Sequence, residues 1–359
     1  MSSNAMPYLR EDVRQLAPYG VSPGTDGIAL QRNEAPFELP EPIRDEILER
    51  VRTAAWRRYP DSNQRDLREA TRRALALPDS LDVVFASGSN TLIQAILTAC
   101  VDPGSAVVVP QPTFSLYARM TRFAHGTPIL IPPRADLGFD VSEILGAAER
   151  HDARVIFLCR PNNPTGMTLP LSDIERLAAE SEALLVIDEA YAAFAGEDAL
   201  SVAAQRNNTL VLRTFSKAFF GAGLRIGYAI AQAELIEQVS KTLAPYALGL
   251  MATEVAKVAL ARRDELAKPR AQLIAERDRL AEALATCPGV TVVPSHANFV
   301  CAQTPIPGDQ LTERLAMRRL YVRDLSEYPG LSHGIRITVG TAEENDRLID
   351  ALREELEAT

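Results

Sequence analysis

Four short polar motifs contain the residues of this 359-residue sequence that could carry out chemistry, and each follows an apolar run. SGSN, at 87–90, follows VVFA, and PNNPTG, at 161–166, follows VIFLC. Asp188 follows LLVI and begins the motif DEAY, and Lys217 follows LVLRTFS. If these runs are strands of one open α/β sheet, their carboxyl ends meet at one edge, where such sheets bind ligands. We therefore expect the four motifs to form one site.

Lys217 and Asp188 suit a particular cofactor chemistry. Lys217 lies among Ala, Phe and Gly residues, where partial desolvation lowers the pKa of a lysine and favours the neutral amine that forms an imine. Asp188 ends an apolar run, where a carboxylate needs a partner such as a pyridinium N–H. A solvated surface lysine and an aspartate that caps a helix would be the ordinary interpretations. The motifs around both residues favour the catalytic interpretation.

The other polar residues suit a phosphate and a phenolate. Residues 88–90 begin a predicted helix over 91–100, whose amino-terminal N–H groups attract an anion, while Ser216 adds a hydroxyl and Arg225 a guanidinium. Asn163 and Tyr191 can donate hydrogen bonds to a phenolate oxygen, although PNNPTG alone could be only a turn. One ligand with an aldehyde, a phosphate and a pyridine nitrogen would account for all of these residues.

The elements that position these motifs follow from the alternation of short apolar runs with amphipathic segments such as 91–100 and 171–182. This alternation predicts an α/β fold with a mainly parallel sheet that is covered on both faces. The predicted strands are 81–86, 106–109, 128–131, 155–159, 184–187, 210–213 and 226–230.

After about residue 248 the pattern changes to a long charged helical region, 252–286, in which Pro269 either begins a new helix or kinks a continuous one. Short strand candidates and a closing helix from about residue 343 follow. We therefore predict three parts of the chain: an amino-terminal arm at 1–40, a large domain at 41–248 and a small α+β domain at 249–359. The strand candidates of the small domain are 290–293, 298–301 and 335–339.

The composition argues against several other classes of protein. The net charge is −9 and no lysine- or arginine-rich block is present, so we expect no nucleic-acid surface. No apolar run approaches the ~18–20 residues that span a bilayer, and no signal core is visible, so we expect a cytoplasmic protein with reduced cysteines. Metal-binding spacings and a Walker A motif are absent, and GAGLRIG has its third glycine one residue late for a dinucleotide-binding loop. We expect no metal site.

The motifs SKAFFGAGLRIGY, PNNPTG and DEAYAAF, together and in their order along the chain, resemble those of the fold-type I pyridoxal-phosphate aminotransferases, and most closely the histidinol-phosphate aminotransferase group. The resemblance runs from LAPY at 16–19 to GIRITVG at 334–340. It implies a large domain with a seven-stranded, mainly parallel sheet, a smaller α+β domain, and a homodimer with active sites at the interface.

The resemblance also implies roles for the cofactor-binding residues. Lys217 holds the cofactor as a Schiff base and later moves a proton, and Asp188 pairs with the pyridine nitrogen. Asn163 and Tyr191 contact the phenolate oxygen, and Phe114 stacks on the ring, although core packing would also explain a phenylalanine there. The residues expected to bind the phosphate are Ser89, Asn90, Ser216, Arg225 and, from the partner subunit, Tyr59, which could instead be an ordinary turn residue before Pro60.

On the substrate side, the resemblance implies that Arg336 binds a carboxylate and that Tyr19 and Arg323 lie near the substrate side chain. Arg336 could instead be an ordinary exposed strand arginine. The sequence departs from the group's pattern at Ala35, at Arg160, and at the apolar segment 247–250. The amino donor is therefore open among histidinol phosphate, an aromatic amino acid and another small amine, with a 2-oxo acid such as 2-oxoglutarate as acceptor.

Two further classes of pyridoxal-phosphate protein stay open at this point. One is a lyase that resembles threonine-phosphate decarboxylase, and the other is a non-enzymatic regulator that binds pyridoxal phosphate. The motif DEAYAAF and the carboxyl-terminal IRITVG favour the aminotransferase over the lyase.

Overall fold

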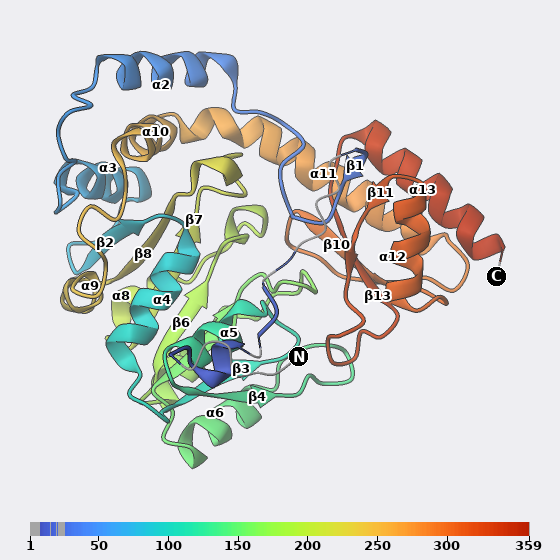
Figure 1. Cartoon of the computed structure of the whole chain (residues 1–359), viewed down its shortest axis with the longest axis horizontal. Helices are drawn as coiled ribbons and strands as arrows, with labels where there is room; N and C mark the ends of the chain where they lie inside the picture. The colour runs from blue at the N-terminus through green and yellow to red at the C-terminus, as the bar shows by residue number, and fades with distance from the viewer. Residues whose placement is uncertain (1–7, 15, 19, 21–25, 359) are drawn as a thin grey trace.

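A computed structural model describes residues 8–14, 16–18, 20 and 26–358 of the chain. A sheet forms the centre of the larger lobe (Figure 1). Its strands are apolar along nearly their whole length, as expected when helices cover both faces of a sheet. All seven predicted runs are strands of this sheet. The strands are β2 (Leu81–Ala86), β3 (Ala106–Pro110), β4 (Thr127–Ile131), β5 (Val155–Cys159), β6 (Leu184–Asp188), β7 (Thr209–Thr214) and β8 (Gly227–Gln232).

The order of these strands is β2-β8-β7-β6-β5-β3-β4. Strand β8 is antiparallel to both of its neighbours, and the other pairs are parallel. This confirms the predicted mainly parallel, seven-stranded sheet. The carboxyl ends of β2, β5, β6 and β7 therefore meet at one edge, which is where the four polar motifs begin.

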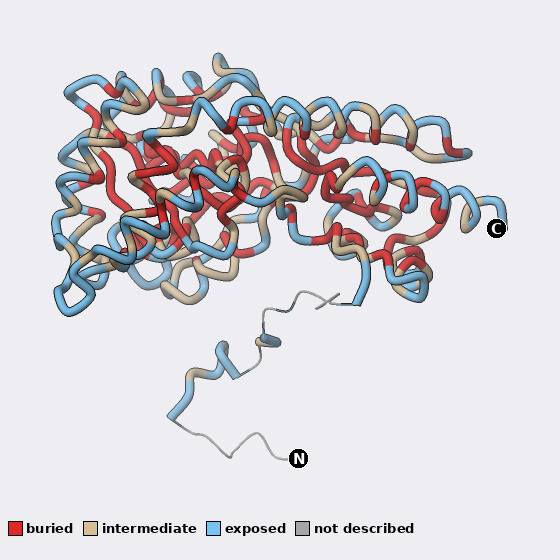
Figure 2. The backbone as a smooth tube through the Cα atoms, turned by 90° about the horizontal axis from the view of Figure 1, so that it is seen from above, coloured by how far each residue is buried: buried red, intermediate tan, exposed pale blue. Residues whose placement is uncertain are grey.

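Helices cover the sheet, and the core lies where their apolar sides pack against its strands (Figure 2). Helix α4 packs against β2, β7 and β8, and α6 packs against β3 and β4. Helix α10 packs against α2 and α3 above the sheet (Figure 1). The helices of this part of the chain are α2 (Glu41–Thr53), α3 (Arg65–Leu75), α4 (Ser89–Cys100), α5 (Leu116–Phe123), α6 (Val141–Arg150), α7 (Leu171–Glu180), α8 (Leu200–Gln205), α9 (Ala233–Ser240) and α10 (Leu250–Ala261).

A second, smaller sheet is antiparallel and has the order β12-β13-β10-β9. The long charged region is two helices, α10 and α11, separated by a 3-10 turn at Arg263–Leu266. Pro269 lies in the first turn of α11, so it begins a new helix and does not kink a continuous one. The elements of this lobe are α11 (Ala267–Ala285), β9 (Thr291–Val293), β10 (Phe299–Gln303), α12 (Gly308–Met317), β12 (Arg323–Asp324), β13 (Gly334–Thr338) and α13 (Ala342–Glu357).

The amino-terminal segment joins the two lobes. Strand β1 (Ile28–Ala29) pairs in parallel with β11 (Leu320–Tyr321) of the smaller lobe, and the chain then runs through residues 31–34 to α2. Before β1, a short helix, α1 (Glu11–Arg14), lies beside the large lobe, where Arg10 donates hydrogen bonds to carbonyls at the end of α5. The pairing of β1 with β11 holds segment 31–34 between the two sheets.

The four cysteines are free thiols; Cys159, Cys287 and Cys301 are buried and Cys100 is half-buried. Among the described helices, none combines the length and the apolar composition that a membrane-spanning helix requires.

Candidate active site

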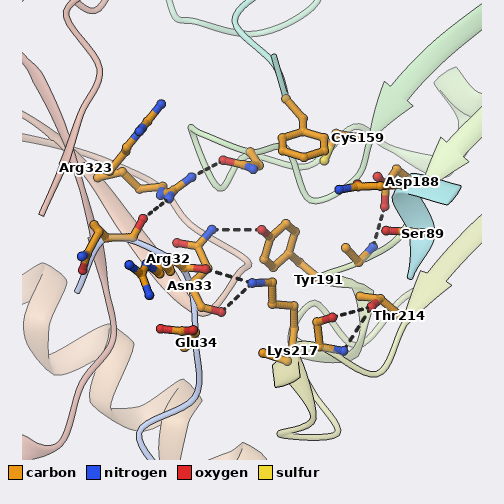
Figure 3. Close-up of a pocket in the computed structure, with 18 of the residues that line it drawn as sticks. Arg32, Asn33, Glu34, Ser89, Cys159, Asp188, Tyr191, Thr214, Lys217 and Arg323 are labelled. Carbon is orange, nitrogen blue, oxygen red and sulfur yellow. Dashed lines mark hydrogen bonds between the residues drawn. The ribbon is translucent and has the colours of Figure 1, made fainter. Parts of the chain in front are cut away.

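The four polar motifs meet in one cavity of about 380 Å³ at the carboxyl edge of the large sheet. Residues 31–34 and side chains of the smaller lobe close its other side (Figure 3). Tyr59 does not line this cavity, and Tyr19 lies outside the described residues. The predicted residues that do line it are Ser89, Asn90, Phe114, Asn163, Asp188, Tyr191, Ser216, Lys217, Arg225, Arg323 and Arg336.

Lys217 follows β7 and points into the cavity toward segment 31–34 (Figure 3). Its Nζ donates hydrogen bonds to the carbonyl oxygens of Arg32 at 3.0 Å and Asn33 at 2.9 Å. Burial lowers the pKa of Lys217 to about 7, and the positive charges of Arg336 and Arg225 act in the same direction. Near neutral pH a large fraction of Lys217 is therefore the neutral amine that attacks an aldehyde.

Asp188 ends β6, and its carboxylate is buried. The hydroxyl of Tyr117 donates to Oδ2 at 2.8 Å, and the Ala190 amide donates to Oδ1 at 3.1 Å. Burial raises the pKa of Asp188, and these two hydrogen bonds lower it. No lysine or arginine of the described residues forms an ion pair with Asp188. A cationic pyridinium N–H fits this carboxylate, because a buried charge needs a partner of opposite sign.

The start of α4 carries groups that suit an anion. Gly88 precedes the helix with φ 84°, no side chain caps the first turn, and that turn contains no acidic residue. Arg225 lies beside this turn, and its Nη1 donates to the hydroxyl of Ser216 at 3.5 Å. A Cβ atom at Gly88 would lie 2.6 Å from Nη2 of Arg225, so a side chain there would displace the guanidinium. Free helix N–H groups, a guanidinium and a hydroxyl fit a phosphate group.

Hydrogen bonds from both lobes fix the side of the cavity opposite the phosphate site. The Tyr191 hydroxyl accepts a hydrogen bond from Nδ2 of Asn33 at 2.9 Å, and burial raises the pKa of Tyr191 well above its ordinary value. Arg336 donates to the side-chain oxygen of Asn163 and, at 2.7 Å, to the carbonyl of Gln31. Because its pKa is raised, Tyr191 keeps its proton at neutral pH and can donate it in a hydrogen bond.

Several residues of the site were not predicted from the sequence. Tyr117 lies one helical turn after Phe114, a spacing that could have indicated a second aromatic side chain beside the ring position, and their rings lie edge to face at 5.5 Å. Segment 31–34 reaches the cavity only because β1 pairs with β11. No local signal marks Tyr328, which lines the cavity from the smaller lobe, or Thr214, whose hydroxyl donates to that of Ser216 at 2.9 Å.

The fold, together with the lysine amine and the buried carboxylate at one edge of its α/β sheet, fits the class of fold-type I pyridoxal-phosphate enzymes. The comparisons with known proteins agree with this class. The profile of the family "Aminotransferase class I and II" matches residues 25–352. The chain belongs to this family and is a pyridoxal-5′-phosphate-dependent aminotransferase.

The chain is similar over nearly its whole length to histidinol-phosphate aminotransferases. It is 36% identical to histidinol-phosphate aminotransferase 2 of Burkholderia pseudomallei (strain 1710b), over 96% of this chain and 97% of that protein. It is 34% identical to the histidinol-phosphate aminotransferase of Chlorobium phaeovibrioides (strain DSM 265 / 1930), over 98% of each.

Solved structures share the fold. The crystal structure of histidinol-phosphate aminotransferase from Sinorhizobium meliloti in complex with pyridoxal-5′-phosphate has a TM-score of 0.89 and 24% identity, over 99% of this chain and 100% of that one. L-threonine-O-3-phosphate decarboxylase from Porphyromonas gingivalis has a TM-score of 0.79, also at 24% identity, over 92% of this chain and 99% of that one. The fold is therefore common to a transaminase and a decarboxylase.

Proposed function

We propose that this enzyme transfers an amino group from histidinol phosphate, or a closely related amine, to a 2-oxo acid such as 2-oxoglutarate. The similarity to histidinol-phosphate aminotransferases over nearly the whole chain supports this proposal. The observation that carries it is a pair of arginines on neighbouring strands. Arg323 and Arg336 are paired across β12 and β13, and both line the cavity that contains Lys217.

The two arginines differ in how they are held. Arg336 is buried, and its hydrogen bonds to Gln31 and Asn163 fix its guanidinium. Arg323 is half-buried, and its side chain forms no hydrogen bond or ion pair with the rest of the described chain. A rigid guanidinium suits the carboxylate of every 2-oxo acid acceptor, since bidentate pairing demands fixed geometry. The unengaged Arg323 suits the phosphate of the donor.

The proposed roles of the chain's residues follow from this geometry. When bound, pyridoxal 5′-phosphate supplies an electron sink for the reacting carbon of the substrate. Asp188 keeps the pyridine nitrogen protonated, and Asn163 and Tyr191 donate hydrogen bonds to the phenolate oxygen. Phe114 packs on the face of the ring. Lys217 would anchor the cofactor through Nζ and, once freed by the substrate amine, would carry a proton from the reacting carbon of the substrate to the former aldehyde carbon of the cofactor.

The phosphate of the cofactor is proposed to bind Ser89, Asn90, Ser216 and Arg225 of one chain and Tyr59 of a second copy. Tyr59 is 80% exposed and stacks on Tyr246, with ring centroids 4.4 Å apart. Trp56 and Leu48 of the same region are also exposed. A homodimer would cover this apolar surface and would bring Tyr59 to the partner's site.

Single-turnover rates with variants of the two arginines test the substrate assignment. Arg336→Lys should slow the half-reaction with 2-oxoglutarate, because an ammonium group cannot pair with a carboxylate through two parallel bonds. Arg323→Gln should slow the half-reaction with histidinol phosphate, by about tenfold to a hundredfold, since a charged hydrogen bond contributes about 1.5–3 kcal/mol.

Histidinol, which lacks the phosphate, is the matched control donor, and Arg323→Gln should leave its rate nearly unchanged. An aromatic amino acid as donor would give a different pattern, in which Arg336→Lys slows both half-reactions and Arg323→Gln slows neither. Release of CO2 from a phosphorylated amino acid, without amino transfer, would show that the enzyme is a lyase.

A further inference from the structure

A cluster of buried charges lies directly behind the carboxyl edge of the large sheet. In the paired rows at this edge, Cys159 of β5 lies opposite Asp188 of β6, which lies opposite Leu212 of β7. The next residue along the chain is charged in each case: Arg160 directly after β5, Glu189 directly after β6, and Arg213 within β7. Because successive side chains of a strand alternate between its faces, these three point away from the face that carries Asp188.

Hydrogen bonds and ion pairs connect these three residues to one loop. Arg213 donates to Glu189 at 2.8 Å and to Asp198 at 2.7 Å. Arg160 donates to Glu197 at 2.5 Å, and its Nη1 lies 3.9 Å from Oε1 of Glu189. We call these five residues, Arg160, Glu189, Glu197, Asp198 and Arg213, the strand-end cluster.

Arg160 is the member that connects most parts of the site. Its side chain is only 1% exposed, and Nη1 has no hydrogen-bond partner in the described structure. Its backbone amide donates to the carbonyl of Asp188 at 2.9 Å, and its Nε donates to the carbonyl of Leu169 at 2.7 Å. Through Glu197 it also holds the loop that follows Tyr191 and the 3-10 turn Ala192–Phe194.

Stability alone does not account for such a cluster. Burying charges costs several kcal/mol per ion, and apolar side chains of similar volume usually stabilise a core at least as well. An arginine with one unsatisfied N–H group is a poor choice for stability. The Arg160 side chain does, however, connect the loop after Tyr191, through its hydrogen bond to Glu197, with the end of β6, through its ion contact with Glu189.

We propose that Arg160 is a positioning residue for the cofactor ring: it holds the Asp188 and Tyr191 segments in register through Glu189 and Glu197. This inference rests on the proposed roles of Asp188 and Tyr191. Loss of the Arg160 side chain removes one of the cations beside the buried Glu189 and releases Glu197. The contacts of Asp188 and Tyr191 with the cofactor ring then lose their fixed geometry. The cofactor remains bound, because its phosphate site and Lys217 are untouched.

The test is Arg160→Gln in the cofactor-bound enzyme, with Arg150→Gln as matched control. Arg150 pairs with Glu143 at 2.6 Å on α6 and is 56% exposed, so its loss removes the same charge outside the site. The visible circular dichroism of bound cofactor reports the orientation of its ring. We expect Arg160→Gln to bind a full equivalent of cofactor, to lose at least half of the dichroism, and to reduce kcat at least tenfold with KM within about threefold, since small misplacements are costly in rate.

Arg160→Lys, which keeps the charge but not the planar fork, should recover part of both signals. A folded Arg160→Gln protein with unchanged dichroism and kcat within twofold of the parent would overturn the proposal. If this variant does not fold, Glu197→Gln provides the test, because Glu197 is half-exposed and its substitution leaves the core intact. Glu197→Gln should also lower the dichroism of the bound cofactor, and an unchanged dichroism in this variant would overturn the proposal as well. The dichroism needs no amino donor, so a failed substrate assignment would not affect this result.

Discussion

If Lys217 is the residue that binds the cofactor, its protonation state determines the pH at which the site can take up pyridoxal phosphate. Its pKa is about 7, compared with an ordinary value of 10.5, because of burial and the nearby Arg336. The neutral fraction of Lys217 therefore rises with pH through about 7. At a fixed concentration of pyridoxal phosphate, the rate of covalent uptake by the cofactor-free protein should rise up to about pH 7 and change little above pH 8, as measured by stopped-flow absorbance.

Arg336→Gln removes a neighbouring positive charge and should move the midpoint of this profile to higher pH. Uptake that still increases about tenfold per pH unit between 8 and 10 would mean that Lys217 has an ordinary pKa, and the account of its environment would then be wrong.

Asp188 is the second residue whose role can be isolated. Asp188→Asn keeps the shape of the side chain and can still accept a hydrogen bond from Tyr117, but it removes the negative charge that favours a protonated pyridine nitrogen. We expect kcat to fall by more than tenfold, which corresponds to about 1.4 kcal/mol of barrier, while cofactor affinity weakens much less. Steady-state kinetics and a cofactor titration measure the two effects separately. A decrease of less than tenfold would contradict the assigned role.

Among the elements, the close approach of β8 to the turn before α4 shapes the proposed phosphate site. A Cβ atom at Gly227 of β8 would lie 2.3 Å from the amide nitrogen of Ser89. Gly227→Ala should therefore displace this turn and weaken cofactor affinity at least tenfold, as measured by equilibrium titration. Gly249→Ala is the matched control, because a Cβ atom there meets open space and should leave the affinity unchanged.

The strands of the large sheet were predictable from sequence because they are covered on both faces and are therefore continuous apolar runs. The two-residue strands β1, β11 and β12 were not, since such short strands leave no periodic signal and form only where distant segments meet. Helix α12 was also not predicted from the sequence.

The residues of the candidate site also differ in how far the sequence predicts them. Residues at or just after the ends of the large sheet's strands, such as Asp188 and Lys217, could be placed from the sequence. Asn33 and Tyr328 could not, because they reach the cavity through contacts between lobes that are far apart in the chain. The division of the chain at 40 and 248 stays a prediction.

At the scale of the whole molecule, the proposed dimer divides each site between two chains, and mixed dimers test this arrangement. In a dimer of one Lys217→Ala chain and one Tyr59→Ala chain, one site carries both substitutions and the other carries neither. If Tyr59 completes the partner's site, mixing two inactive or impaired variants should restore activity, up to about half that of the parent in each mixed dimer. If each site is built from a single chain, mixing should add nothing to the activities of the separate variants. Co-expression with two purification tags followed by an activity assay measures this directly.

The proposed bond between Lys217 and the cofactor can be tested directly, because the sequence contains only four lysines. The other three are Lys241, Lys257 and Lys268, and none of them lines the cavity. The purified protein should be yellow, and borohydride should abolish the colour and fix the cofactor irreversibly to one lysine. Peptide mass spectrometry after this reduction should find the added mass on Lys217, and the Lys217→Ala protein should carry none. Reduced cofactor on another lysine, or a colourless protein that takes up no added pyridoxal phosphate, would contradict the account.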